Sequence, residues 1–276
     1  MRPFTPLPSR PLRPVLARTA LLVVALGLLP ACATRPPASD PVALAQYKKV
    51  DDPREPMNRE IYKFNNGFDR YLLGPITTAY TTVFPRVFRD ALHNFLVNLD
   101  APIVFINDVL QAQPKRATDT LGRFVMNSTV GVGGLFDPAT GISIPYHDED
   151  FGQTLAVYGV KDGGYLMIPI YGPSSTRDGF GLVVDLAMDP VSWVFRWQHV
   201  AYLSWPRLGA KAIDKYDHNR GILDDLRENS LDGYAALRSY YRQNREFEIR
   251  NGKAQSQEDQ QKQNDLFEDF DDESGQ

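Results

Sequence analysis

Apolar side chains recur at helical spacing through the first part of the chain. Between residues 57 and 72 they return every three or four positions, which places them on one face of a helix. We expect this helix to end at Gly74-Pro75. A second helix with an apolar stripe along one face is predicted after Pro85, over residues 86–99.

The next apolar segment has no polar face. Asp100-Ala101-Pro102 has the composition of a helix N-terminus, with a capping side chain and proline in the first turn. Residues 103–106 are then consecutive apolar residues. A helix over 101–111 would be about 16 Å long, roughly half the hydrocarbon thickness of a bilayer. Such a segment is expected either in a deep core or in contact with lipid.

The remaining pattern is again mainly helical. A more polar helix is predicted over 115–130, and 165–171 is typical of a strand at an edge because it contains a proline. Residues 172–179 suggest a turn that leads into a helix cap. The apolar stretch 180–197 contains charges and Pro190, which favours two short helices meeting at Asp189-Pro190.

The C-terminal part predicts two charged amphipathic helices and a tail. The helices cover 207–226 and 230–249, with breaks expected at Gly221 and Asp232-Gly233. Residues 251–276 hold two lysines against eight acidic residues and almost nothing apolar. We expect this tail to be disordered. The fold class predicted is therefore mainly α, with one domain over 52–250.

The N-terminal region has the composition of a secretory signal. Four arginines precede an apolar run of about ten residues, too short to span a bilayer as a helix. Leu29-Pro30-Ala31-Cys32 then resembles a bacterial lipobox. We interpret 1–31 as the signal peptide, Cys32 as the lipidated residue and the proline-rich 32–51 as a tether. The alternative is an ordinary signal peptide followed by an incidental free thiol.

The charge balance argues against nucleic acid as a partner. Removing residues 1–31 takes away four of the 30 basic residues and none of the 34 acidic ones, which leaves a net charge of about −8. A basic face is the usual requirement for binding nucleic acid. Ala33, directly after the cysteine, resembles the residue choice of lipoproteins sorted to the outer membrane rather than retained at the inner membrane.

Three motifs could carry chemistry, and each has a simpler interpretation. Gly131-Val132-Gly133-Gly134 lacks the following Lys-Ser/Thr of a nucleotide loop, so a turn is favoured. The run 147–150 has no second histidine at ligand spacing, which favours a solvated loop or a helix N-terminus. The Gly-x-Ser-x-Gly elbow of a lipase is missing, and the four histidines have no evident partners. We expect no enzyme activity, no cofactor and no metal site.

Several motifs in order resemble the MlaA (VacJ) family of outer-membrane phospholipid-trafficking lipoproteins. The similarity runs from about residue 52 to 247. It rests on these motifs: Asp52-Pro53-Arg54-Glu55-Pro56-Met57-Asn58-Arg59 with Phe64-Asn65, Asn94-Phe95-Leu96-Val97-Asn98-Leu99, Arg123-Phe124-Val125-Met126-Asn127-Ser128-Thr129, Gly131 to Asp137, Glu149 to Leu155 with Tyr158-Gly159-Val160, and Gly172 to Asp178. Two departures replace a family proline by glycine, at Gly164 and at Gly233.

The resemblance implies a ring-like helical body that sits in the periplasmic side of the outer membrane. Its passage would take phospholipids misplaced in the outer leaflet and pass them to a soluble periplasmic carrier. The family is also found with trimeric porins. The alternative is a structural lipoprotein that braces porins or the envelope without lipid transfer.

The candidate lipid passage comes from the family motifs. The residues expected there are Gly131, Gly133, Gly134, Phe151, Gly152, Arg177 and Asp178.

Overall fold

The computed structural model describes residues 50–253. The signal peptide, Cys32, most of the tether and residues 254–276 of the tail lie outside this range, so their predictions are not tested. The last tether residue, Asp51, already belongs to the folded body, because its carbonyl accepts a hydrogen bond from the Tyr165 N–H (3.1 Å).

The described chain is almost entirely helical. The elements in order are α3 (Glu55–Phe68), a π-helical turn (Asp69–Leu73), α4 (Gly74–Val83), α5 (Arg86–Leu110), α6 (Pro114–Thr129), α7 (Pro138–Gly141), α8 (Phe151–Val157), β1 (Tyr165–Ile168), β2 (Gly172–Ser175), α9 (Thr176–Met188), α10 (Pro190–Trp197), a 3₁₀ turn (Ala201–Leu203), α11 (Ser204–Glu228) and α12 (Gly233–Ile249).

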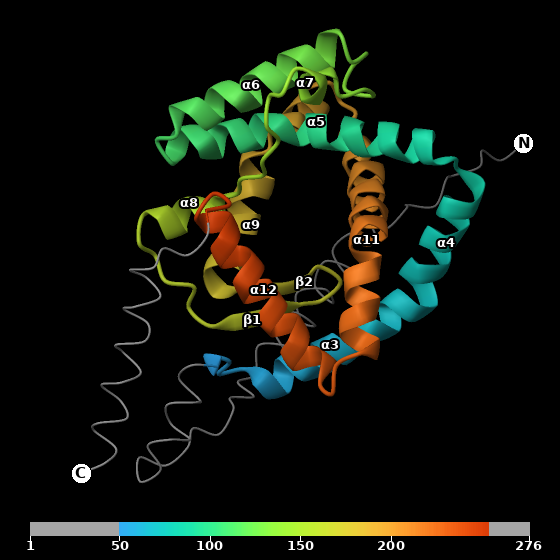
Figure 1. The fold of residues 1–276 in the computed structure, drawn as a ribbon, viewed down its shortest axis with the longest axis vertical. Coiled ribbons are helices and arrows are strands. Elements are labelled where there is room, and N and C mark those ends of the chain that lie inside the picture. The colour runs from blue at the N-terminus through green and yellow to red at the C-terminus, as the bar shows by residue number, and fades with distance from the viewer. Residues whose placement is uncertain (1–49, 254–276) are drawn as a thin grey trace, which may run out of the picture.

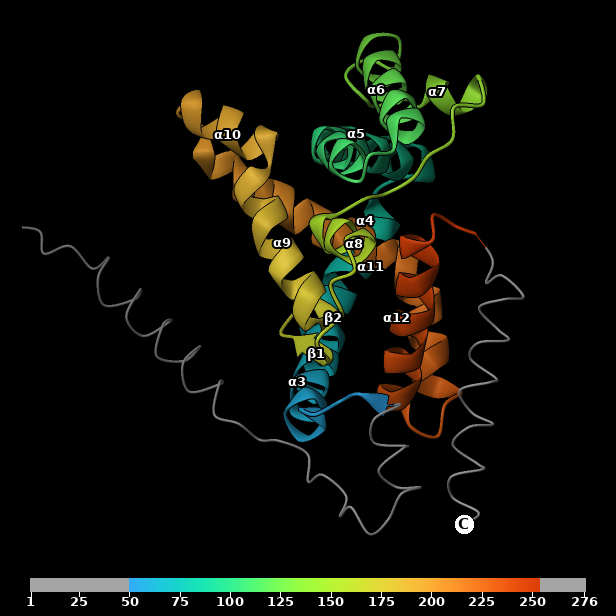
Figure 2. The ribbon, with the colours of Figure 1, turned by 90° about the vertical axis from the view of Figure 1, so that its left-hand side faces the viewer.

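The helices are arranged as a ring. In Figure 1, α5 lies across one end and α3 lies at the other, while α11 runs between them and α9 with α12 form the opposite side. Helix α11 contacts both α4 and α5, and α12 contacts α8 and β2. Figure 2 shows from the side that α6, α7 and α10 extend beyond the ring at the end where α5 lies.

The predicted break at Gly74-Pro75 is wrong. The chain passes from α3 through the π-helical turn into α4, and the Gly74 N–H donates to the Asp69 carbonyl. Proline fits this position because the first turn of a helix needs no N–H there. Glycine is needed too, since a Cβ at Gly74 would lie 2.8 Å from the Asp69 oxygen.

The predicted boundary at Asp100-Ala101-Pro102 is also wrong. Helix α5 continues through it for 25 residues, with Pro102 inside. The Asp100 carboxylate does not cap a helix, because it binds Arg207 and Lys211 of α11, each at 2.7 Å. A partner more than 100 residues away therefore overrides the local capping signal.

The other helix and strand boundaries are compared with their predictions in the same way. Helix α11 is not broken at Gly221, since one interior glycine costs only about 1 kcal/mol. Residues 172–175 form a strand and not a turn, although Ser175 caps α9 as expected, accepting from the Asp178 N–H. The polar helix α6 and the junction of α9 with α10 at Asp189-Pro190 are confirmed.

The small sheet is completed by side chains of α3. The strands β1 and β2 pair antiparallel, which leaves one edge of β1 open. Asn58 donates to the Tyr165 carbonyl (3.2 Å) and accepts from the Met167 N–H (2.9 Å). Seven residues later, Asn65 donates to the Ile168 carbonyl (3.1 Å) and accepts from the Ile170 N–H (2.8 Å). Two asparagines on one helical face therefore bind the strand edge.

Compared with a typical water-soluble protein, the distribution of apolar side chains is inverted, with few in the interior and many on the surface. Of residues 50–253, only eight apolar residues are buried, against 17 polar or charged ones. The central cluster is small: Tyr165, Met167 and Tyr234, with aromatic neighbours in edge-to-face contact. Many large apolar side chains are exposed instead. In the described chain, each helix is either too short or too polar to traverse a bilayer.

Two helical glycines offer a matched test of the packing. Helices α8 and α9 cross so closely that a Cβ on Gly181 would lie 2.4 Å from the Gly152 nitrogen, whereas Gly221 has open space around it. We expect Gly181→Ala to lower the free energy of unfolding by about 1–3 kcal/mol. Gly221→Ala should raise it by about 0.5–1 kcal/mol. Thermal unfolding in detergent measures both, and equal effects would contradict the close crossing.

Candidate functional site

An exposed apolar surface follows α9, α10 and the start of α11. All three tryptophans of the sequence lie there, with Trp193, Trp197 and Trp205 at 59%, 78% and 76% exposure. The Trp193 indole N–H donates to the Ala187 carbonyl (2.7 Å), so its remaining exposed surface is apolar. Contiguous apolar patches mark membrane or partner sites, and tryptophan is enriched at membrane–water interfaces.

The two carboxylates within this apolar stretch point into the protein, whereas Arg196 is exposed and lies over the Trp193 ring. Asp189 is buried and binds Arg207 of α11 at 2.5 Å. Burial alone would raise the pKa of Asp189, but hydrogen bonds from Arg207 and Ser192 hold it below its ordinary value. Asp185 accepts from the Phe151 N–H (2.9 Å). The carboxylates thus contact other helices and leave the outer face apolar.

Three side chains are exposed to solvent although protein flanks them on several sides. Tyr146 and Tyr171 are about half exposed and Asp148 is exposed. Even so, the surrounding protein raises the pKa of Tyr146, raises the pKa of Tyr171 to about 12 and raises that of Asp148 to about 7. Side chains that are accessible but flanked by protein are expected to line an enclosed opening.

Charged groups from several elements surround these side chains. Carboxylates of Asp150 and Asp100 add to the raised pKa of Asp148, while Lys211 opposes it. The Lys215 ammonium lies 5.0 Å from the centroid of the Tyr171 ring, at cation–π distance. We call Tyr146, Asp148, Tyr171, Lys211 and Lys215 the inner face. It mixes both charge signs with aromatic surface.

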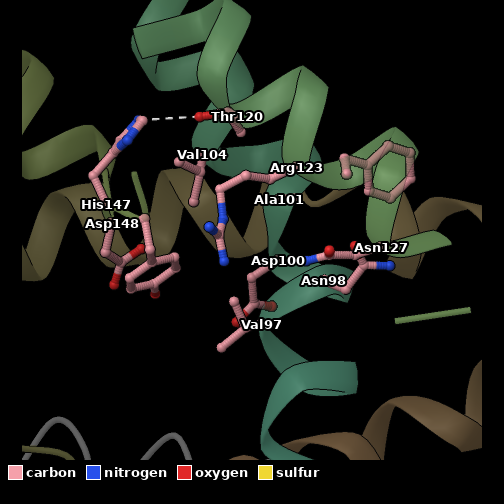
Figure 3. A pocket seen from close by; sticks show the side chains of 12 residues that line it. Val97, Asn98, Asp100, Ala101, Val104, Thr120, Arg123, Asn127, His147 and Asp148 are labelled. Carbon is pink, nitrogen blue, oxygen red and sulfur yellow. Dashed lines mark hydrogen bonds between the residues drawn. The ribbon is translucent and has the colours of Figure 1, made fainter. Parts of the chain in front are cut away.

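A cavity between α5, α6 and the loop that carries His147 shares Tyr146 and Asp148 with the inner face. In Figure 3, the Arg123 side chain extends into the space between this loop and α5. Arg123 donates to Asp137 and to the Ile144 carbonyl, both at 2.6 Å. The cavity volume is about 60 Å³, enough for a few water molecules. It is too small for a phospholipid.

The structure brings four of the predicted passage residues together. Phe151 and Gly152 begin α8, and Arg177 and Asp178 begin α9. A Cβ on Gly152 would lie 2.5 Å from the Asp178 carboxylate. The side chains of Arg177 and Asp178 are 7% and 8% exposed and form an ion pair at 2.9 Å. These four residues pack one helix start against another.

The predicted glycines lie elsewhere, in the turn after α6. Gly133 and Gly134 have positive φ angles of 71° and 94°, and a Cβ on Gly134 would lie 2.6 Å from Cβ of Asn98 on α5. A Cβ on Gly131 would lie 2.4 Å from the Phe136 carbonyl oxygen. Gly133 alone of the three has open space around it. A role of all seven residues in lipid passage stays a prediction.

Arg245 on α12 connects the two helix starts and was not predicted from the sequence. Its guanidinium binds Asp150, which caps α8, at 2.6 and 2.7 Å, and Asp178 at 3.0 Å. Burial would raise the pKa of Asp178, but Arg245 holds it well below its ordinary value. Tyr234, Arg238, Tyr241 and Arg245 recur at helical spacing. This alternation of tyrosine and arginine is the sequence pattern that could have indicated the role of Arg245.

The run 147–150 was interpreted as either a solvated loop or a helix N-terminus. Asp150 caps α8, as the second interpretation predicts. Glu149 is buried and binds Arg116 at 2.5 Å and Gln111 at 2.7 Å. His147 also has a partner, Asp108 at 3.1 Å. The expectation that the histidines lack partners is therefore wrong.

A helical ring with apolar side chains outside and paired charges inside defines a membrane-associated ring protein. The chain belongs to the MlaA lipoprotein family, whose model matches residues 50–248.

Named relatives agree with this assignment. The chain is 34% identical over 214 residues to the "Intermembrane phospholipid transport system lipoprotein MlaA" of Haemophilus influenzae. The aligned region covers 75% of this chain and 83% of that protein. It is 33% identical over 215 residues to the protein of the same name from Escherichia coli, covering 75% and 82%.

A solved structure has the same fold. It is described as "Structural basis for maintenance of bacterial outer membrane lipid asymmetry", and it matches with a TM-score of 0.63 and 31% identity. The match covers 72% of this chain and 98% of that one.

Arg245 provides the test of the ionic network. Replacing it by methionine leaves Asp150 and Asp178 without their shared cation, so Arg245→Met should lower the free energy of unfolding by about 3 kcal/mol. Both aspartates have lowered pKa values. Their contribution is therefore present above about pH 4 and is lost as the pH falls through their folded pKa values.

Unfolding measured from pH 7 to pH 3 should accordingly show the difference between wild type and Arg245→Met shrinking as the pH falls. Arg250→Met, at the residue that follows α12, is the matched control. Within residues 50–253, Arg250 forms an ion pair with Glu246 one turn earlier, and its loss should cost less than about 1 kcal/mol. A difference that does not change with pH would contradict the assigned role of the two aspartates.

Proposed function

We propose that this chain is an outer-membrane lipoprotein that removes mislocalised phospholipids from the outer leaflet and so maintains lipid asymmetry. The observation that carries the proposal is the inverted body, with apolar side chains outside and few inside. The names of the relatives, which are intermembrane phospholipid transport lipoproteins, support the same class of substrate. No enzyme step is proposed.

The inner face is the proposed route for the lipid headgroup. A phospholipid that crosses the periplasmic side of the membrane needs polar contacts for its headgroup and apolar surface for its chains. The inner face supplies carboxylate, ammonium and phenol groups. The exposed tryptophans of α10 and α11 supply an interfacial anchor outside. Lipid would then pass to a soluble periplasmic carrier, with trimeric porins as neighbours in the membrane.

The first test of this proposal concerns the anchor. Cys32 is the single cysteine of the sequence. We expect Cys32→Ser to abolish acylation and to reduce the fraction of protein in the outer membrane, although the exposed apolar helices should retain some weak binding. Metabolic labelling with an alkyne-bearing palmitate followed by membrane fractionation measures both. Label on the serine variant would refute the lipid anchor.

The second test concerns transport and uses two glycines with the same backbone requirement. Gly133 and Gly159 have φ angles of 71° and 81°, and neither has a neighbour within reach of a Cβ. Valine should therefore cost each about 1–2 kcal/mol of backbone strain. If the turn after α6 shapes the passage, Gly133→Val should impair removal of outer-leaflet phospholipid and Gly159→Val should not.

Outer-leaflet phospholipid is read by an outer-membrane acylase that uses it as donor, in cells with equal amounts of each variant. Equal lipid asymmetry in both variants would show that the turn after α6 only connects two segments and does not shape the passage. Normal asymmetry in cells that lack the protein altogether would favour the alternative, a structural lipoprotein that braces the envelope.

A further inference from the structure

A cluster of two histidines and one aspartate lies where α5 meets α11. His93 comes from α5, while Asp214 and His218 are four residues apart on α11 and so share one helical face. Nδ1 of His93 lies 2.9 Å from Oδ2 of Asp214, and Nδ1 of His218 lies 3.5 Å from Oδ1. Both imidazoles therefore turn the same nitrogen toward the two oxygens of one carboxylate.

The two rings are also held against each other. Their centroids are 4.2 Å apart and their planes differ by 28°. One potential ligand atom from each of the three side chains lies within 4.8 Å of the other two. Within residues 50–253 this is the one group of at least three such side chains with that geometry. Stacked imidazoles repel when both are protonated, and a bound metal ion would keep them neutral, whereas the Asp214 carboxylate favours protonation.

The donor set fits a zinc ion. Zn²⁺ binds imidazole nitrogen and carboxylate oxygen, and three protein ligands with one open position are a common arrangement. The His218 side chain is half exposed, which gives an ion access from solvent, while the Asp214 side chain is largely buried. The hydroxyl oxygen of Tyr80 on α4 is buried and makes no hydrogen bond to the rest of the described chain. Its pKa is raised, by burial first and then by Asp214 and Asp217.

The neighbouring charges do not compete for the carboxylate. The nearest cation of α5, Arg89, is paired with Asp217 at 2.6 Å. Asp214 is left to the two histidines, and His218 Nδ1 also lies 3.0 Å from the Asp214 carbonyl oxygen. A bound ion would replace these hydrogen bonds with bonds to neutral imidazoles.

We propose that His93, Asp214 and His218 form a Zn²⁺ site that fastens α5 to α11. The position matters because α11 joins α5 to α4 on one side of the ring (Figure 1). An ion there would fix the relative placement of two long helices that carry inner-face residues on the α11 side. The sequence alone predicted no metal site, since the two elements are more than 100 residues apart.

The test is Zn²⁺ titration of the full, lipidated chain in detergent, followed by calorimetry and metal analysis. We expect one ion per chain in the wild type. His218→Gln, at a half-exposed position, should weaken binding at least about tenfold, and His93→Gln should do the same from the other helix. Co²⁺ should give the visible absorption of a tetrahedral site in the wild type and not in either variant.

His199→Asn is the control, because His199 is exposed, lies outside the cluster and has a φ of 59°, which asparagine tolerates. It should bind Zn²⁺ as the wild type does. Zinc should also raise the unfolding temperature of the wild type and of His199→Asn, but not of His218→Gln. The proposal is overturned if the wild type binds no zinc, or if both cluster variants bind it as tightly as the wild type.

Discussion

The pairing of buried polar side chains is the constraint on which this ring depends. A body that turns its apolar residues outward cannot be held by a large hydrophobic core, so its inner contacts must come from hydrogen bonds and ion pairs. Arg245 shows how this works. One guanidinium holds carboxylates at the N-terminal ends of α8 and α9, where the helix dipoles also favour negative charge. Three helices are fixed by one residue and two partners.

The same constraint explains where the charges of the apolar stretch go. Asp185 and Asp189 would be costly in a hydrocarbon environment, but both point at helices from distant parts of the sequence. Their partners on α5, α8 and α11 close the ring. The outer face of α9 and α10 can therefore stay largely apolar, with neither of the two carboxylates left unpaired behind it. The inward hydrogen bonds and ion pairs of Asp185 and Asp189 thus both close the ring and leave an apolar surface for contact with the membrane.

The sequence pattern predicted what is local and missed what is distant. Helix α6 and the Asp189-Pro190 junction follow from periodicity and from proline, which act within a few residues. The continuous α5 could not be predicted, because the partner of Asp100 is Arg207, on another helix. The family motifs include Gly152 and Asp178, which the fold brings together. They gave no indication that the turn of Gly133 lies apart, or that Arg245 connects the pair.

The asparagines of α3 have a consequence for the chain before it reaches the membrane. A two-stranded hairpin with an open edge can recruit a strand from another molecule, which leads to aggregation. Asn58 and Asn65 occupy the donors and acceptors along the edge of β1. A helix that binds the edge of β1 in place of a strand thereby blocks this edge to a strand from another molecule. For a protein with so much apolar surface already exposed, this protection removes one route to self-association during transit through water.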